Sequence, residues 1–210
     1  MTEKPAAPKT TPDRAQLAKF AKTIKLQEHV VLLDRDGTLN VDRADYVKSP
    51  AEVTLLPGVP EAIARLTQAG WRVLVLTNQA CVAKGIITGV QLEEIHRVIS
   101  DRIAQKGGKI DRWYICPHQD GDGCDCRKPL PGLVNQARRD WRFEPSRTYV
   151  VGDAARDMAM ARAGGCQGAL VLTGKGEQEA AQVPGVPQYR DLTAFVDALL
   201  SGSLGAISAR

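Results

Sequence analysis

Residues 30–38 read Val-Val-Leu-Leu-Asp-Arg-Asp-Gly-Thr, an apolar run that ends on two carboxylates two positions apart. The apolar run predicts a buried strand, and because Asp is a poor strand residue, Asp34 and Asp36 mark its end. Two like charges this close resist joint ionisation unless a cation or a proton neutralises them. Mg²⁺ takes oxygen ligands and leaves room for a substrate phosphate, and one carboxylate can act as a nucleophile while the other transfers a proton. The segment therefore predicts an enzyme that acts on phosphate groups.

The rest of the chain alternates predicted strands and helices. Strands are expected at 30–33, 71–76, 112–115, 148–151 and 168–172, and helices at 57–69, 90–105, 131–141, 155–163 and 192–200. Several of the strands are apolar throughout, which is typical of a parallel sheet covered on both faces. We therefore expect an α/β protein with a three-layer Rossmann-like fold and a parallel sheet of about five strands. No large insertion is present, so we expect only a minimal cap over the site.

Polar residues follow four of the predicted strands, which favours one shared site. Besides the two carboxylates after the first strand, Thr77 and Asn78 follow the second, Lys128 lies beyond the third, and Asp153 follows the fourth. In open parallel sheets, ligands bind outside the carboxyl ends of the strands. Each residue also has an ordinary interpretation, such as a turn residue, a solvated surface lysine or a helix N-cap. Asp157 either assists Asp153 or pairs with a basic side chain, and the sequence leaves this open.

Three of the five cysteines crowd into one short segment. The candidate metal ligands there are Cys116, His118, Cys124 and Cys126. A C-x-H pair followed by a C-x-C pair matches a closed tetrahedral Zn²⁺ site, which keeps no position open for catalysis. Zinc would order a loop of Gly and Asp residues that has no apolar side chain to pack. A local disulfide and unliganded thiols remain as alternatives. We assign no role to His29 or His96.

Composition and charge argue against several other classes of protein. The chain has 210 residues and a formal net charge of +4, without any long block of Lys and Arg. This balance gives no reason to expect a nucleic-acid partner. No apolar stretch approaches ~18 residues, so we expect no membrane span, and the polar start lacks the apolar core of a secretory signal. We expect a cytoplasmic monomer that acts on a small phosphorylated substrate.

We divide the chain into three parts. Residues 1–27 are expected to form an N-terminal tail, within which the apolar residues of 17–24 have the spacing of a short amphipathic helix. Residues 28–200 are expected to form one folded domain that carries the chemistry. Residues 201–210 are expected to form a C-terminal tail.

The polar residues at the strand ends resemble the four motifs of the haloacid dehalogenase-like phosphohydrolases. The matching segments are Asp34-x-Asp36-Gly37-Thr38, Thr77-Asn78, Lys128-Pro129 and Gly152-Asp153-x-x-x-Asp157. By this resemblance, Asp34 attacks phosphorus and forms an aspartyl-phosphate. Asp36 protonates the leaving oxygen and then activates water.

The same resemblance implies how the phosphoryl group and the metal ion are held. The phosphoryl group would be held by Thr77, Asn78 and Lys128. Mg²⁺ would be bound by the Asp34 carboxylate, the Asp36 backbone carbonyl and Asp153, with Asp157 as a candidate further ligand. Such an arrangement compensates the charge on the phosphoryl oxygens, which phosphoryl transfer requires.

With the cysteine segment included, residues 29–200 resemble two zinc-containing groups of that family. These are the D-glycero-D-manno-heptose 1,7-bisphosphate phosphatases and the histidinol-phosphate phosphatases. The segment Asn40-Val41-Asp42 with Tyr46-Val47 favours the heptose group, and Lys84 stands where that group carries Arg. The resemblance thus implies removal of the 7-phosphate of a heptose bisphosphate. The implied substrate-binding residues are Asn40, Asp42, Tyr46, Gln79, Lys84 and Arg127.

Some departures keep other substrates open. Ala80-Cys81 replaces the usual Ser-Gly, Ala154 stands where the heptose group often has Lys, and the cysteine loop is short, as in the histidinol-phosphate phosphatases. A histidinol-phosphate phosphatase is therefore the first alternative. A nucleic-acid 3′-phosphatase is a second, but it would need a basic groove lined with aromatic residues, and only 5% of this chain is aromatic.

Overall fold

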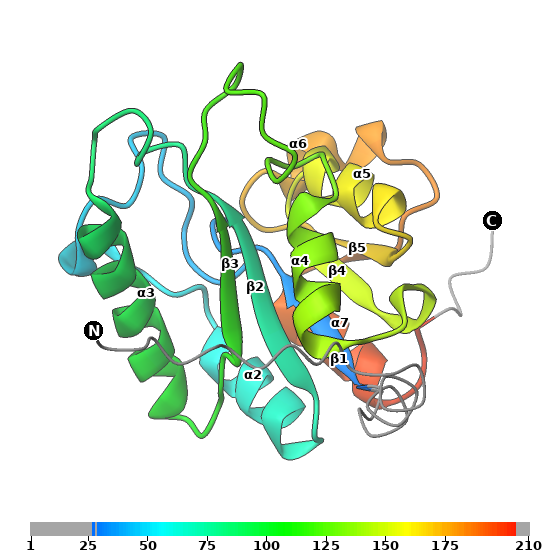
Figure 1. The fold of residues 1–210 in the computed structure, drawn as a ribbon. Coiled ribbons are helices and arrows are strands. Elements are labelled where there is room, and N and C mark those ends of the chain that lie inside the picture. The colour runs from blue at the N-terminus through cyan, green and yellow to red at the C-terminus, as the bar shows by residue number, and fades with distance from the viewer. Residues whose placement is uncertain (1–26, 28, 205–210) are drawn as a thin grey trace, which may run out of the picture.

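In a computed structural model that describes residues 27 and 29–204, the chain forms a six-stranded parallel sheet with helices on both faces (Figure 1). The strands are β1 (Val30–Leu33), β2 (Arg72–Asn78), β3 (Arg112–Cys116), β4 (Tyr149–Gly152), β5 (Gln167–Val171) and β6 (Gln188–Tyr189). The α-helices are α2 (Val59–Gln68), α3 (Gly89–Ala104), α4 (Gly132–Trp141), α5 (Ala155–Ala163), α6 (Gly176–Glu179) and α7 (Leu192–Leu200). Short 3-10 helices cover Pro50–Glu52, Pro145–Arg147 and Ala180–Gln182.

Two hydrophobic layers enclose the sheet, and β1 contributes to both. Val31 and Leu33 join the layer that contains residues of α2, α3 and α7. Val30 and Leu32 join the opposite layer, which contains residues of α4 and α5. Because side chains alternate across a strand, burial on both faces requires the continuous apolar sequence that β1 has. Figure 1 shows the two sets of helices on opposite sides of the sheet.

The strand order places the end of β1 at the centre of one sheet edge. The order is β3-β2-β1-β4-β5-β6, and every neighbouring pair is parallel. From β1 the chain therefore continues outward on one side through β2 and β3, and later on the other side through β4, β5 and β6. The loops that follow β1, β2 and β4 meet at this reversal, which is where open α/β sheets bind ligands.

The turn after β1 requires glycine. Gly37 has φ of 80°, and a Cβ added there would overlap the Asp153 carboxylate. Gly174, with φ of 56°, approaches the same carboxylate from the loop after β5. Only glycine combines a positive φ with the absence of a side chain, so both loops can close around Asp153.

The predicted α/β fold is confirmed, and all five predicted strands are present. The sheet has a sixth strand that the sequence analysis missed, because β6 is only two residues long and directly follows Pro187. The helix expected within 17–24 lies outside the described residues. In the described part of the chain, the apolar helices are all too short to span a membrane.

Candidate active site

Lys128 joins two buried carboxylates at the centre of the sheet edge. Its Nζ donates to Asp34 Oδ1 and to Asp157 Oδ1, at 2.7 Å in both cases, and none of the three side chains is more than 5% exposed. Burial raises the pKa of Asp34 to about 6, although Lys128 works against this rise. Burial also opposes the charge of Lys128, but the two carboxylates outweigh it and raise the pKa of the amine. The trio is therefore a desolvated ion cluster in which the lysine stays cationic.

Asp34, Asp153 and Asp157 have the arrangement of a divalent-cation site. Each offers a carboxylate oxygen, and these oxygens lie within 4.8 Å of one another. Asp153 Oδ2 accepts a hydrogen bond from the Lys175 backbone at 2.9 Å, whereas Asp153 Oδ1 is buried without a partner. Burial and the neighbouring Asp34 raise the pKa of Asp153 to about 7. A hard cation such as Mg²⁺ would satisfy the orphaned oxygen and favour the ionised carboxylates.

Asp36 is held by three side chains at the rim of this centre. Arg35 Nε lies 3.0 Å from both carboxylate oxygens, Asn40 Nδ2 donates to Oδ1 at 2.9 Å, and Gln79 Nε2 donates to Oδ2 at 2.8 Å. Burial opposes ionisation, but the charge of Arg35 and these hydrogen bonds together lower the pKa of Asp36. The Asp36 side chain remains 19% exposed, so it faces the solvent-filled cleft while its orientation is restrained.

Thr77 and Asn78 end β2 next to these groups. Thr77 Oγ1 accepts a hydrogen bond from Gln79 Nε2 at 2.8 Å. The Asn78 side chain pairs with the backbone of Lys128, donating to its carbonyl at 3.2 Å and accepting from its N–H at 3.1 Å. Asn78 thus fixes the loop that presents the lysine, and direct contact of its side chain with a phosphoryl group stays a prediction.

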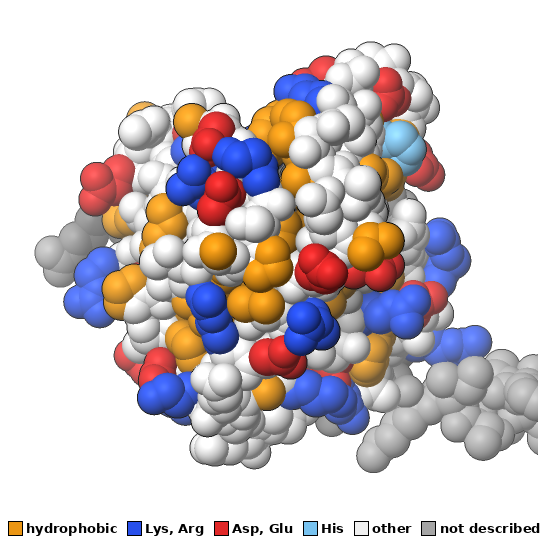
Figure 2. Space-filling model, turned by 90° about the vertical axis from the view of Figure 1, so that its left-hand side faces the viewer, with side chains coloured by type: hydrophobic (Ala, Val, Ile, Leu, Met, Phe, Trp, Pro, Cys, Tyr) orange, Lys and Arg blue, Asp and Glu red, His pale blue; other side chains and the backbone are white. Residues whose placement is uncertain are grey.

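A cleft of about 420 Å³ opens beside Asp36. It is lined by Asp36, Asp42, Arg43, Ala44, Tyr46, Asn78, Ala80, Arg127, Arg156 and Lys175. Figure 2 shows the upper edge of the molecule hollowed between two raised parts that carry Lys, Arg, Asp and Glu side chains. The lining holds more basic than acidic side chains, so the cleft suits an anionic ligand.

Three of the six predicted substrate-binding residues, Asp42, Tyr46 and Arg127, line this cleft, and several of the six already have partners. Asp42 pairs with Lys175 at 3.1 Å. Lys84 does not line the cleft, but its Nζ donates to the hydroxyl of the cleft-lining Tyr46 at 2.8 Å, which links two separate loops. Asn40 and Gln79 do not line the cleft; their side chains bind Asp36 instead, as described above.

Arg156 lines the cleft without an evident partner. It lies in the first turn of α5, and its Nε is buried with no hydrogen-bond partner. Burial opposes its charge, but the nearby carboxylates, led by Asp34 and Asp157, raise its pKa without forming hydrogen bonds to it. A half-buried guanidinium without a bound anion is costly. An anionic ligand in the cleft would relieve that cost.

The cysteine segment has the dimensions of a tetrahedral zinc site. The Cys116 Sγ–His118 Nδ1, Cys116 Sγ–Cys124 Sγ and His118 Nδ1–Cys126 Sγ separations are 3.6, 3.8 and 3.3 Å. Zn–S bonds of about 2.3 Å in a tetrahedron place sulfur atoms about 3.8 Å apart, whereas a disulfide needs about 2.05 Å. The four side chains therefore fit zinc, and the three cysteines are free in this structure rather than joined in a disulfide.

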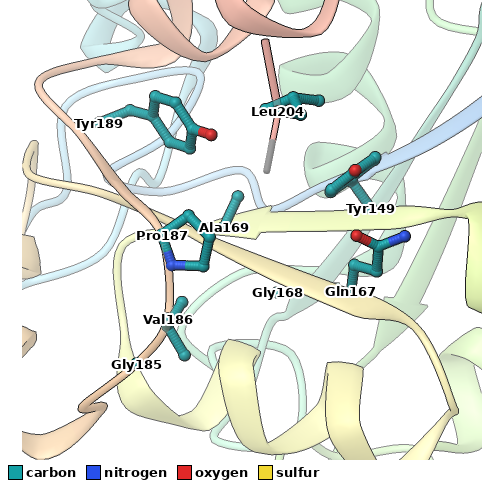
Figure 3. Close-up of a pocket in the computed structure, with 9 residues that line it drawn as sticks. All are labelled: Tyr149, Gln167, Gly168, Ala169, Gly185, Val186, Pro187, Tyr189 and Leu204. Atoms are coloured by element: carbon teal, nitrogen blue, oxygen red, sulfur yellow. The ribbon is translucent and has the colours of Figure 1, made fainter. Parts of the chain in front are cut away.

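A second cavity, of about 230 Å³, lies away from these groups between β4, β5 and the last described residue, Leu204. Figure 3 shows Tyr149, Tyr189 and Leu204 arranged around a space beside Ala169 of β5. None of its lining residues is charged. The cavity lacks the carboxylates and cations that phosphoryl transfer needs, so it is not the candidate active site.

Comparisons with known proteins agree with this geometry. The family model described as HAD-hydrolase-like matches residues 125–196. A D-glycero-beta-D-manno-heptose-1,7-bisphosphate 7-phosphatase of Bordetella bronchiseptica is 42% identical over 175 residues, which cover 81% of this chain and 97% of that protein. The chain belongs to the haloacid dehalogenase-like phosphatases. The protein of the same name from Pseudomonas aeruginosa is 41% identical over 83% of this chain and 99% of its own.

Solved structures of this phosphatase family match as well. The crystal structure of D,D-heptose 1,7-bisphosphate phosphatase from B. bronchiseptica, complexed with magnesium and phosphate, has a TM-score of 0.81 and 41% identity, covering 83% of this chain and 99% of that chain. A putative HAD-like phosphatase from Mesorhizobium loti has a TM-score of 0.73 and 30% identity, over 89% and 91% of the two chains. Magnesium thus occupies a relative that shares the fold.

Three residues at this phosphatase site escaped the sequence analysis. Arg35 was passed over as the variable position between the two motif carboxylates, although it is only 1% exposed. Arg156 was passed over for the same reason, because it is a variable position of the motif that runs from Asp153 to Asp157. His96 was assigned no role, yet it is buried and its Nε2 lies 3.3 Å from Arg35. A signal for His96 was present, because it falls on the buried face of α3 at helical spacing from Leu92.

Proposed function

We propose that this phosphatase removes the 7-phosphate of D-glycero-D-manno-heptose 1,7-bisphosphate through an aspartyl-phosphate on Asp34. The similarity to relatives of that name, over nearly their whole length, supports the substrate class. The observation that carries the proposal is the cleft beside the carboxylate centre, where Arg156 lacks a partner. A bisphosphate could present one phosphate to Asp34 and the other to the basic wall of the cleft, which is formed by Arg43, Arg127, Arg156 and Lys175.

In the first step, an oxygen of Asp34 attacks phosphorus, and the bond from phosphorus to the sugar oxygen breaks. Asp36 gives its proton to that leaving oxygen. The pKa of Asp36 is lowered in the ligand-free site, but an arriving phosphate places like charge beside it and so favours the protonated form. Lys128, which already contacts Asp34, compensates negative charge on the transferring group.

In the second step, water attacks phosphorus and releases inorganic phosphate and the Asp34 carboxylate. Asp36, now ionised, accepts the proton of the water. Its restrained position serves both steps, because the sugar leaves from the side on which the water must arrive. The roles of Thr77 and Asn78 as phosphoryl contacts belong to the same proposal.

The proposed metal ions are Mg²⁺ at the carboxylates and Zn²⁺ at the cysteine segment. Mg²⁺ would be held by Asp34, Asp153 and the Asp36 carbonyl, with Asp157 close by, and would neutralise charge on the phosphate oxygens. Zn²⁺ would be held by Cys116, His118, Cys124 and Cys126 and would order the loop beside Arg127. Thiolate ligands need a reducing compartment, which supports a cytoplasmic location.

The remaining proposals concern organisation. Residues 28–200 would form the catalytic domain, flanked by the two tails, and the protein would act as a monomer on a small substrate rather than on nucleic acid. The short loops around the cleft support this, because a cleft of about 420 Å³ suits a small ligand.

The test is Mg²⁺-dependent phosphate release. It compares kcat/KM on both anomers of heptose 1,7-bisphosphate, on heptose 7-phosphate, on histidinol phosphate and on a 3′-phosphorylated oligonucleotide. We expect one bisphosphate anomer to exceed histidinol phosphate by about 100-fold, which corresponds to about 2.7 kcal/mol. A preference for histidinol phosphate would overturn the substrate and leave the chemistry at Asp34 in place.

A matched pair of variants tests the basic wall. Arg156→Met should lower kcat/KM on heptose 1,7-bisphosphate by roughly tenfold, because it removes a charged hydrogen-bond donor. The same variant should change kcat/KM on heptose 7-phosphate little. Arg162→Met is the control, since Arg162 lies on the same helix but is exposed. An equal loss on both substrates would show that Arg156 does not bind the second phosphate.

A further inference from the structure

Arg35 is a buried guanidinium whose hydrogen bonds are directed at the proposed proton-transfer group. It follows β1, is 1% exposed, and contacts Asp36 through both Nε and Nη2 at distances of 2.8 to 3.0 Å. This fork engages both carboxylate oxygens at once, so rotation of the Asp36 side chain would break several charged hydrogen bonds together. These contacts therefore fix the orientation of the Asp36 carboxylate and also favour its ionised form.

The third nitrogen of the guanidinium contacts an element that supplies none of the predicted site residues. Arg35 Nη1 lies 3.3 Å from Nε2 of His96, which comes from the middle of α3. A guanidinium can only donate, so His96 Nε2 must accept, and the imidazole must be neutral with its proton on Nδ1. Burial, with Arg35 nearby, lowers the pKa of His96 to about 3, which agrees with a neutral ring.

The His96 ring is itself held in place. It stacks on Trp113 of β3, with 4.0 Å between ring centroids and 6° between planes. Trp113 Nε1 donates to Ser100 Oγ at 3.2 Å, and Ser100 Oγ donates to the His96 carbonyl at 2.9 Å. The acceptor that faces Arg35 is therefore fixed by contacts from both α3 and β3.

We propose that Arg35 and His96 are positioning residues, and that His96 acts through Arg35 to hold the Asp36 carboxylate in the orientation in which it gives a proton to the leaving oxygen and accepts one from water. The inference rests on the proposed role of Asp36 as acid and base. It goes further in assigning catalytic consequences to α3, which none of the matched motifs includes.

The Arg35 contacts would preorganise Asp36 for proton transfer. Asp36 lies at the rim of the cleft, where an unrestrained carboxylate would sample several orientations and only one would reach the leaving oxygen. Displacement of a catalytic group by about 1 Å can cost roughly 10²-fold in rate. Asn40 and Gln79 each restrain one oxygen of Asp36, whereas Arg35 restrains both, so loss of the fork should matter most.

The experiment measures the dependence on the leaving group, which a purely structural role would not alter. The variants Arg35→Met, Arg35→Lys, His96→Leu and His96→Gln are assayed on heptose 1,7-bisphosphate and on p-nitrophenyl phosphate, whose leaving group needs no proton. Arg35→Met should lower kcat on the sugar phosphate by about 10²-fold and His96→Leu by about tenfold, with KM nearly unchanged. On p-nitrophenyl phosphate, both should slow the release of p-nitrophenolate in the first turnover by less than about threefold, because that release precedes the attack of water and needs no proton from Asp36.

Conservative variants supply a rescue, and an exposed neighbour supplies a control. His96→Gln keeps an acceptor and should recover most of the His96→Leu loss, while Arg35→Lys keeps charge without the fork and should recover little. Arg97→Gln, at a position 68% exposed on the same helix, should leave both substrates unaffected. Thermal unfolding of each variant excludes a general loss of folded protein.

Asp36→Asn separates failure of this inference from failure of the proposed function. If Asp36→Asn slows leaving-group release in the first turnover only on the sugar phosphate, but Arg35→Met slows it equally on both substrates or on neither, then the positioning role is wrong and Asp36 remains the acid. If Asp36→Asn shows no dependence on the leaving group, the acid assignment fails and the positioning role fails with it.

Discussion

The two candidate metal centres of this chain are built in opposite ways. The carboxylate centre brings together Asp34, Lys128 and Asp153, which follow three different strands and are all at most 4% exposed. The cysteine centre draws all its ligands from the segment 116–126, and part of that segment is exposed. One centre depends on the completed sheet, and the other depends on a short loop.

This difference predicts what each centre contributes. Hydrogen bonds and packing of the sheet hold the carboxylates together, although their burial costs desolvation free energy. Carboxylates held in this way are suited to binding a cation and to reacting with a substrate. The loop at 119–123 has no apolar side chain to bury, so a bound metal would add to the few polar contacts that hold it, such as Arg127 Nε to Asp120. Substitutions at the first centre should therefore remove activity and spare stability, and those at the second should act mainly on stability.

The largest effect is expected for Asp34→Asn. Loss of the nucleophile should lower kcat by roughly 10⁴- to 10⁶-fold, as seen when other covalent catalysts lose theirs. The midpoint of thermal unfolding should not fall, because the change removes a buried charge whose pKa burial has already raised. Phosphate release and a thermal melt measure the two quantities. Retained turnover would remove Asp34 as the nucleophile.

Cys124→Ser should give the opposite pattern. Serine is a poor zinc ligand, so native mass spectrometry should show loss of about one zinc per chain. We expect destabilisation of several kcal/mol in denaturant unfolding, since the loop has no apolar side chain to pack and loses the metal that would order it. The kcat should fall much less than in Asp34→Asn. Cys166→Ser, at a position outside the cluster, is the control and should keep its zinc.

The contrast also explains what could be predicted from sequence. The cysteine ligands are close in the chain, so their spacing alone indicated the site. The carboxylates are far apart, but each ends or follows an apolar strand, and the rule that parallel strands share an edge placed Asp34 and Asp153 together. Lys128 was placed by its motif. It gives Asp157 a basic partner, while the Asp157 carboxylate also lies with Asp34 and Asp153 in the candidate cation site, so a role for Asp157 as a metal ligand stays a prediction.

Other features depended on contacts that no local pattern encodes. The approach of His96 to Arg35 results from how α3 packs beside the β1 loop, and helical spacing could have indicated only the burial of His96. The unpartnered state of Arg156 is likewise a property of the assembled cleft. β6 forms because a two-residue segment happens to lie beside β5, and such short pairings carry no periodicity.

A pH dependence of metal binding would sharpen the comparison for the carboxylate centre. The pKa of Asp153 is raised to about 7 and that of Asp34 to about 6, so the metal-free protein binds protons there that Mg²⁺ must displace. Mg²⁺ affinity by calorimetry should therefore rise about tenfold from pH 6 to pH 8. Affinity that stays constant across this range would contradict the raised pKa values.

The raised pKa values of Asp34 and Asp153 also determine how the stability of the metal-free protein changes with pH. Carboxyl groups with raised folded-state pKa values stabilise the metal-free protein at low pH, and this contribution is lost as pH rises from about 4 to about 7. Mg²⁺ should consequently raise the unfolding midpoint more at pH 8 than at pH 5.5. Asp153→Asn, which removes one of the two groups, should weaken both the Mg²⁺ effect and its pH dependence.

The smallest effect is expected at Arg127, the residue that connects the two regions. Its Nη1 donates to the His118 carbonyl at 3.1 Å, its Nε donates to Asp120 at 2.6 Å, and it also lines the cleft. If the zinc loop only presents Arg127 to the substrate, Arg127→Gln should raise KM about threefold to tenfold through one lost charged contact and leave kcat and zinc content unchanged. Zinc loss in this variant would show that the two centres are not independent, because a cleft residue would then be stabilising the zinc loop. An unchanged KM would instead show that the loop contributes stability alone.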